Sequence, residues 1–247
     1  MTDWLEGEIV ERTQWTEGLF SLRFRADLGG FKAGQFVRIA LDVDGERVGR
    51  PYSLVNAPHE SLLEIYFNVV ESGPLSPRLA QLNPGDRLWL TDKANGFLVL
   101  DEVPATRHLW LLATGTGIGP FLSMLKTEEP WQRFDKVILG HSVQHASELA
   151  YRDTIEAVRA AHGDKFQYVQ LVTREQVPGA LGQRIPASIE SGALEGQTGV
   201  TLSPECSHVL LCGNSAMITD VTETLAKRAM HRHRRREPGH ITTEKYH

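Results

Sequence analysis

Thr114-Gly115-Thr116-Gly117-Ile118-Gly119-Pro120-Phe121 follows directly on the apolar run LWLLA at residues 109–113. This order predicts a buried strand that ends in a glycine-rich turn and the start of a helix. Glycines let the backbone approach phosphate oxygens, and the free N–H groups at a helix start stabilise negative charge. The stretch therefore predicts a pyrophosphate site, although its G-x-G-x-G-P spacing differs from the common dinucleotide pattern G-x-G-x-x-G. Taken alone, an ordinary strand-to-helix turn is the alternative.

The composition is that of a folded globular protein. The chain has 247 residues, of which 41% are hydrophobic and 23% charged, enough for one large domain or two small ones. It has no apolar run long enough to cross a bilayer, and its first residues lack the pattern of a signal peptide. We therefore expect a cytoplasmic protein that does not bind membranes.

Cysteine and histidine usage limits the redox chemistry that the protein can perform. Cys206 and Cys212 are the two cysteines, too few for a four-cysteine iron–sulfur cluster. The histidines lack metal-ligand spacing, so no metal site is predicted. Any redox function must therefore use an organic cofactor. The net charge of −5 gives no general attraction to nucleic acid.

The hydrophobic pattern divides the chain into two parts. Up to about Thr91, short segments with alternating apolar residues are separated by turns, which predicts a small antiparallel barrel. Afterwards, predicted strands at 109–113, 136–140, 167–173 and 208–212 alternate with helical patterns at 148–161 and 216–230. That alternation predicts a parallel sheet covered by helices. We place the boundary within residues 101–107.

A second motif, Arg50-Pro51-Tyr52-Ser53, lies near the end of the β-rich part. Together with the glycine-rich stretch it resembles the ferredoxin-NADP reductase family, in its bacterial flavodoxin/ferredoxin type. Further matches occur in the family's order at Gly73-Pro74-Leu75-Ser76, Thr173-Arg174, Gly182-Gln183-Arg184-Ile185 and Cys212-Gly213-Asn214. The resemblance implies an FAD-binding β-barrel domain over residues 1–101 and an NADP(H)-binding α/β domain over 102–247.

The resemblance also implies which residues hold FAD. Arg50 would pair with the pyrophosphate, Tyr52 would pack on the flavin, Ser53 would bond near the reactive N5, and Ser76 would be a second phosphate anchor. The implied FAD contacts are Arg50, Pro51, Tyr52, Ser53, Phe67, Gly73, Leu75, Ser76, Thr116, Tyr246 and His247. For the Arg50 motif, the alternative is a strand start made rigid by proline. For Tyr246 and His247, a frayed tail is the alternative to stacking on FAD.

For NADP(H), the implied contacts are Thr114, Gly115, Gly117, Arg174, Arg184, Cys212 and Gly213. The 2′-phosphate of NADP needs guanidinium partners, which Arg174 and Arg184 would supply. The alternative is two solvated surface arginines. Residues 142–145 (SVQH) lack an arginine that bacterial relatives often carry, so selectivity for NADPH over NADH could be weaker. Ser53 and Cys212 are the predicted catalytic residues, and a small buried hydrophobic role is the alternative for Cys212.

The run His231-Arg232-His233-Arg234-Arg235-Arg236 closes the last helical pattern. Capping of a helix C-terminus is one interpretation. The other is a docking surface for an acidic ferredoxin or flavodoxin, formed by Arg232, Arg234, Arg235 and Arg236. The prediction is a monomeric FAD enzyme that transfers electrons between NADP(H) and such a carrier, by hydride transfer between nicotinamide C4 and flavin N5. The reductase component of an oxygenase, or a flavin subunit of a larger complex, are the alternatives.

Overall fold

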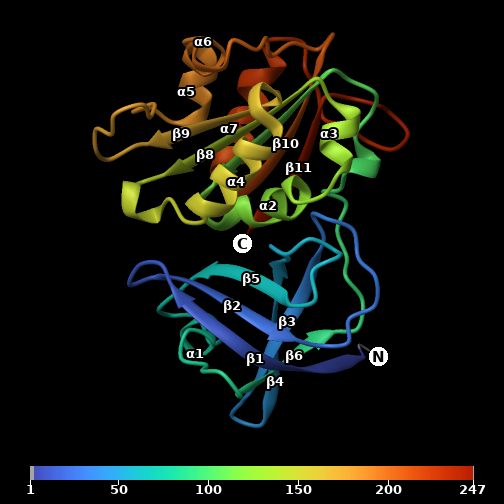
Figure 1. Ribbon diagram of the computed structural model, residues 1–247, viewed down its shortest axis with the longest axis vertical. Helices are drawn as coiled ribbons and strands as arrows, with labels where there is room; N and C mark the ends of the chain where they lie inside the picture. Colours follow the sequence, from blue (N-terminus) through green and yellow to red (C-terminus); the bar gives the residue numbers. More distant parts are fainter. Residues whose placement is uncertain (1–2, 247) are drawn as a thin grey trace.

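The computed structural model describes residues 3–246 and shows two sheets, one above the other (Figure 1). The lower, six-stranded sheet is antiparallel, and its order is β4-β3-β6-β1-β2-β5. Its strands are β1 (Trp4–Gln14), β2 (Leu19–Arg25), β3 (Phe36–Val43), β4 (Glu46–Ser53), β5 (Leu63–Asn68) and β6 (Arg87–Thr91). A bridge between Leu54 and Ile65 joins the β4 and β5 ends of the sheet, so the sheet curls into the predicted barrel. Helix α1 (Ser76–Leu79) follows β5.

The barrel interior follows from the alternation along its strands. Leu22 and Phe24 on β2, and Leu63, Ile65 and Phe67 on β5, all belong to one buried cluster. Successive side chains of a strand point to opposite faces, so the intervening residues face outward or toward the second sheet.

The upper, five-stranded sheet is parallel, and its order is β11-β10-β7-β8-β9. Its strands are β7 (His108–Thr114), β8 (Lys136–Val143), β9 (Phe166–Val172), β10 (Ser207–Asn214) and β11 (Ile241–Tyr246). The α-helices are α2 (Gly119–Leu125), α3 (Glu129–Arg133), α4 (Arg152–His162), α5 (Ile185–Glu190), α6 (Ala193–Thr198) and α7 (Ser215–Ala226). Short 3₁₀ helices are η1 (Leu100–Glu102), η2 (Gly115–Ile118), η3 (Ala146–Glu148) and η4 (Gly163–Lys165). None of the helices within residues 3–246 is long and apolar enough to cross a membrane.

Strand β7 is buried on both faces, as its apolar run predicts. Leu109, Leu111 and Ala113 pack in the cluster that contains α2 and α4, whereas Trp110 and Leu112 pack with α5 and α7. The four predicted parallel strands are confirmed, with ends that differ by at most three residues.

The second half of the chain differs from the expectations at four points. The predicted helix at 148–161 begins only at Arg152, because Tyr151 has a left-handed φ of 57° that interrupts it. The predicted helix at 216–230 ends at Ala226, and the left-handed Ala229 turns the chain away. The run 231–236 is therefore a loop, and it cannot cap the helix. Residues 241–246, for which no strand was predicted, form β11 beside β10.

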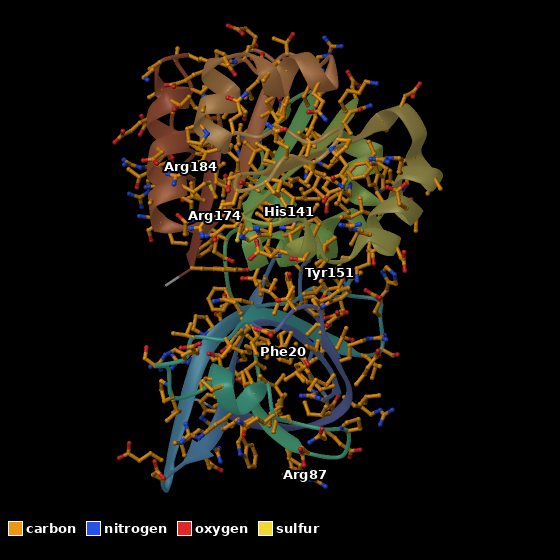
Figure 2. All side chains as sticks on the ribbon, turned by 90° about the vertical axis from the view of Figure 1, so that its left-hand side faces the viewer. Phe20, Arg87, His141, Tyr151, Arg174 and Arg184 are labelled. Atoms are coloured by element: carbon orange, nitrogen blue, oxygen red, sulfur yellow. The ribbon has the colours of Figure 1, made fainter. Side chains whose placement is uncertain are left out.

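The two sheets are fixed to each other by a shared core and by polar contacts. Leu19, Val55 and Tyr66 of the barrel belong to the same buried cluster as α2 and β7. The Tyr151 hydroxyl donates to Glu64 Oε1 at 2.6 Å, and the Ser123 hydroxyl donates to the carbonyl of Asn56 at 2.6 Å. Tyr151 lies at the junction of the two units in Figure 2.

Candidate functional site

The C-terminal ends of the parallel strands lie at the edge of the upper sheet that faces the barrel (Figure 1). Open parallel sheets bind ligands beyond this edge. The stretch predicted to hold a pyrophosphate forms the end of β7, the turn η2 and the first turn of α2. Gly115 has a left-handed φ of 52°, a conformation that glycine adopts without strain.

Gly117 and Gly213 are places where two loops of this edge touch. A Cβ on Gly117 would overlap the carbonyl oxygen of Cys212 and lie 2.9 Å from the Gly213 nitrogen. The Thr114 hydroxyl accepts hydrogen bonds from the backbone and the side-chain amide of Asn214, both at 3.2 Å. The loops after β7 and β10 therefore form one tightly packed unit.

A cavity of about 700 Å³ opens between these loops and the barrel. Arg174, after β9, and Arg184, before α5, both border it, and both are exposed. Figure 2 shows the two arginines on the same side of the upper unit. Within residues 3–246, neither guanidinium forms a salt bridge. Other lining residues come from both sheets: Leu19, Asn68, Thr114, Gly115, Thr116, Ser142, Gln144, Glu148, Gly213, Asn214 and Tyr246.

His141 on β8 lies beneath the glycine loop, and the sequence analysis did not single it out. Its side chain is fully buried, and Nε2 lies 2.9 Å from the carbonyl oxygen of Gly115. Burial lowers the pKa of His141 to about 4, so the ring is neutral near pH 7 and donates from Nε2 to this carbonyl. A histidine near the end of a predicted buried strand was the signal that could have identified it.

The barrel and the upper sheet meet in a hydrogen-bonded group of three residues. The Tyr246 hydroxyl donates to Ser53 Oγ at 3.0 Å, and Ser53 in turn donates to Glu244 Oε1 at 3.2 Å. Burial raises the pKa of Glu244 to about 7, although the bond from Ser53 opposes the rise. Tyr246 also lines the cavity, so this group lies where the cavity meets the barrel. The sequence analysis missed Glu244 because its side chain becomes buried only when residues 241–246 form β11.

Cys212 lies in β10 directly opposite Glu244 of β11. Its side chain is fully buried in the core, and burial raises the pKa of the thiol well above its usual range. A neutral buried thiol is a poor nucleophile. The residue contacts the cavity loop through its carbonyl oxygen, which packs against Gly117.

The Arg50 motif occupies the end of β4. Arg50 and Pro51 are exposed, Tyr52 is half-buried and Ser53 is buried. The Arg50 guanidinium donates to the carbonyl of Gly49 at 2.9 Å, which leaves most of its donors free. Burial raises the pKa of Tyr52 to about 12, so its hydroxyl stays protonated.

Phe67, a predicted FAD contact, is 3% exposed in the barrel core, where its ring meets the edge of the Tyr52 ring at 5.9 Å. It packs against Tyr52, and its contact with FAD stays a prediction. Tyr66, on the opposite face of β5, points toward the upper sheet, and its buried hydroxyl has no partner among the described residues. Because side chains alternate between the two faces of a strand, the sequence could have indicated that Tyr66 faces away from the barrel interior.

Thr116, a predicted FAD contact, is buried in η2, and three others follow β5. Ser76 is the first residue of α1, and its buried hydroxyl accepts a hydrogen bond from the Val70 N–H at 2.9 Å. Leu75 lies in the barrel core, and Gly73 forms a turn with Val70. His247, predicted with Tyr246 as a stacking residue, lies outside the described residues.

Two family models match the chain. An oxidoreductase FAD-binding domain matches residues 8–91, and an oxidoreductase NAD-binding domain matches residues 111–223. The chain is 45% identical, over the full length of both proteins, to a flavodoxin/ferredoxin–NADP reductase of Escherichia coli. The chain belongs to the flavodoxin/ferredoxin–NADP reductase family.

Other members agree with this assignment. A ferredoxin–NADP reductase of Pseudomonas aeruginosa is 39% identical over 220 residues, which cover 85% of this chain and 84% of that one. A crystal structure of a ferredoxin NADP⁺ reductase from Neisseria gonorrhoeae, with bound FAD and NADP, has a TM-score of 0.94. It is 34% identical, and the match covers 99% of each chain. The barrel and parallel-sheet architecture predicted from the sequence is thus that of the reductase family.

The residues at the site fit the two cofactors of this family. At the barrel, Arg50 presents donors to a phosphate, and the buried Tyr66 hydroxyl has no partner within residues 3–246. At the upper sheet, an open glycine turn and two arginines without salt bridges border one cavity. Buried polar groups rarely remain unpaired, so a ligand that hydrogen-bonds to Tyr66 is consistent with this donor set.

Glu244 leads to a prediction about reductase stability. Its pKa is raised from 4.5 to about 7 on folding, so the folded state holds a proton that the unfolded state releases between these pH values. Stability contributed by the neutral carboxyl is therefore lost as the pH rises through 7. We expect Glu244→Gln to raise the free energy of unfolding of the apoprotein by about 3 kcal/mol at pH 8, and by less than about 1 kcal/mol at pH 5.

Urea unfolding at the two pH values measures this effect. Glu71→Gln, at an exposed carboxylate in the turn after β5, is the control and should change little at either pH. A stabilisation by Glu244→Gln that is equal at pH 5 and pH 8 would contradict the assigned titration.

Proposed function

We propose that this reductase transfers electrons between NADP(H) and a ferredoxin or flavodoxin, with FAD as its resident cofactor. The observation that carries the proposal is a single cavity bordered by the glycine loop and two arginines, which reaches the Ser53–Glu244–Tyr246 group at the barrel. When bound, FAD supplies the exchange between two-electron hydride chemistry and single-electron transfer. The polypeptide supplies binding, orientation and electrostatics.

At the barrel, Arg50 offers a planar fork of donors to phosphate, and Tyr52 offers a flat ring held by Phe67. Ser53 is small and buried, so it can hydrogen-bond to a flavin without blocking access to it. Glu244 accepts the Ser53 hydroxyl hydrogen, and its pKa of about 7 lets its carboxyl take up or release a proton near neutral pH.

At the upper sheet, the backbone of Gly115 to Gly117 would hold the pyrophosphate, and neutral His141 holds the Gly115 carbonyl in place. Gly213 and Asn214 close the other side of this loop. Arg174 and Arg184 bind the 2′-phosphate, which distinguishes NADPH from NADH. In this proposal, Cys212 shapes by its packing the part of the cavity that receives the nicotinamide ring. It does not act as a nucleophile.

For the carrier, we propose docking on the loop between α7 and β11, which carries Arg232, Arg234, Arg235 and Arg236. The charges of this loop complement an acidic carrier, and the loop lies beside β11, which carries Glu244.

Anaerobic turnover with a carrier tests the proposal. FAD-loaded protein is mixed with excess NADPH and a purified ferredoxin or flavodoxin, and carrier reduction is followed by absorbance. We expect sustained reduction of at least one carrier. Rapid reduction of ferricyanide with no reduction of either carrier would instead identify an NADPH oxidoreductase with another acceptor.

Replacing Arg174 or Arg184 by alanine should raise the KM for NADPH and leave kcat nearly unchanged. The 2′-phosphate is remote from the reacting carbon, so its binding energy is the same in the ground state and the transition state. Each loss should amount to about 1.5–3 kcal/mol, or roughly 10- to 150-fold in KM. Steady-state kinetics with ferricyanide measure this effect. NADH serves as the control substrate, and a parallel rise in the KM for NADH would disprove the 2′-phosphate assignment.

A further inference from the structure

Phe97 is the most exposed large hydrophobic residue among those described, with 65% of its surface accessible. It lies between β6 and η1, and the chain is fixed on both sides of it. Leu98 is 1% exposed in the core shared by the two sheets. On the other side, the backbones of Asn95 and Phe36 exchange two hydrogen bonds, at 2.8 and 2.9 Å. An exposed apolar ring on a rigid backbone loses little entropy when a partner covers it.

Arg235 fixes the ring of Phe97 from one side. Its guanidinium carbon lies 4.6 Å from the ring centroid, which is a cation–π contact. The same guanidinium donates to both carboxylate oxygens of Glu102, with the shortest distance at 2.6 Å. The Arg235 guanidinium therefore binds Glu102 and Phe97, and the Glu102 carboxylate largely neutralises its charge.

The ring lies close to the proposed electron-transfer edge. Gly96, with a φ of 114°, packs so closely that a Cβ there would lie 3.2 Å from Glu244 Oε2. Glu244 is hydrogen-bonded to Ser53. The segment that carries Phe97 therefore packs against β11 beside Glu244.

The charges around Phe97 indicate the chemistry of the partner. Lys93, Arg236 and Lys245 are exposed, and none of them forms a salt bridge within residues 3–246. Arg234 has only a 3.8 Å contact with exposed Glu237. Contacts of Arg235 with Phe97 and of Gly96 with Glu244 join the segments that carry these basic residues. An exposed apolar ring with basic residues on the adjoining segments suits a partner with an apolar centre and an acidic rim.

We propose that Phe97, held by Arg235, is the apolar anchor of the surface that binds an acidic one-electron carrier protein. This inference rests on the proposed function, and it assigns different roles to the arginines of the loop between α7 and β11. Arg234 and Arg236 attract the carrier over distance, whereas Arg235 orients the anchor ring. Binding hot spots typically combine a buried aromatic or arginine anchor with a polar rim that contributes less.

Calorimetric binding of the oxidised carrier to the FAD-loaded protein, at about 0.02 M and about 0.2 M salt, separates the two roles. We expect Phe97→Ala to weaken binding about ten-fold at both salt concentrations, because its contribution is not electrostatic. Phe97→Tyr, which keeps the ring, should retain affinity. Joint replacement of Arg234 and Arg236 by glutamine should weaken binding mainly at low salt.

Val70→Ala is the matched control, because Val70 is the other exposed large hydrophobic residue, at 49%. It lies between β5 and α1, and its replacement should leave carrier affinity unchanged. FAD content and NADPH–ferricyanide activity report on the fold of every variant. Carrier affinity of Phe97→Ala within about two-fold of the wild type would overturn the anchor and leave the proposed function intact. A wild type that neither binds nor reduces any carrier would overturn both.

Discussion

Replacing Gly117 by valine is expected to slow the reduction of bound FAD by NADPH on the order of 100-fold, while FAD stays bound. A Cβ at this position meets backbone atoms of Cys212 and Gly213, and these belong to β10, which is hydrogen-bonded on both sides. Because the backbone of β10 cannot shift without breaking its hydrogen bonds, the loop that carries Gly117 must move instead, and it moves away from the nucleotide. Overpacking of this kind costs about 1–3 kcal/mol, which corresponds to a rate loss of up to roughly 100-fold.

Gly119→Ala is the control for this change. A Cβ on Gly119 would lie 3.4 Å from Val55 Cγ2, which is ordinary contact, and its φ of −48° is helical. We therefore expect FAD content and NADPH kinetics close to those of the wild type. Stopped-flow reduction and flavin analysis measure both variants. Normal NADPH reduction in Gly117→Val would place the nucleotide elsewhere.

The second large effect is expected at Arg50. Replacing it by alanine should raise the dissociation constant of FAD about 10- to 150-fold, the equivalent of a charge-assisted phosphate contact of about 1.5–3 kcal/mol. Stability of the apoprotein should change little, because the Arg50 side chain is exposed and its bond goes to the adjacent Gly49. Fluorescence titration of the apoprotein with FAD and urea unfolding test the two statements.

Two variants make this measurement specific. Arg50→Lys keeps the charge and loses the planar fork, so its affinity for FAD should be intermediate. Arg87→Ala removes an exposed arginine at the end of the barrel remote from the upper sheet (Figure 2), and should bind FAD normally. If Arg50→Ala destabilised the apoprotein as much as it weakened FAD, Arg50 would be a structural residue of the barrel.

The sequence predicted those parts of the fold whose signal is local. Strand β7 and the glycine turn after it are contiguous, and the apolar residues of β2 and β5 alternate within each strand. The same alternation contained the information that Phe67 faces the barrel interior and Tyr66 the other sheet. Tyr66 was missed because the motif pattern, and not the strand period, guided the choice of site residues.

The end of the chain was harder to predict because its structure depends on distant partners. The segment ITTEKY has no strong apolar pattern, and it becomes a strand by pairing with β10. Glu244 acquires its raised pKa only through the burial that this pairing brings, and its hydrogen-bond partner Ser53 lies far away in the sequence. The basic run looked like a helix end, but the left-handed Ala229 and the approach of Gly239 to the backbone of Arg232 make it a loop.

The most direct test of the central claim is a single anaerobic mixing experiment with the FAD-loaded protein and NADPH. If the glycine loop, Arg174 and Arg184 present the nucleotide to a flavin held at Ser53, the flavin absorbance must bleach within one rapid, saturable phase, and much faster at low NADPH than at equal NADH. Flavin that stays oxidised in the presence of saturating NADPH, in protein shown to bind one FAD per chain, would contradict the account.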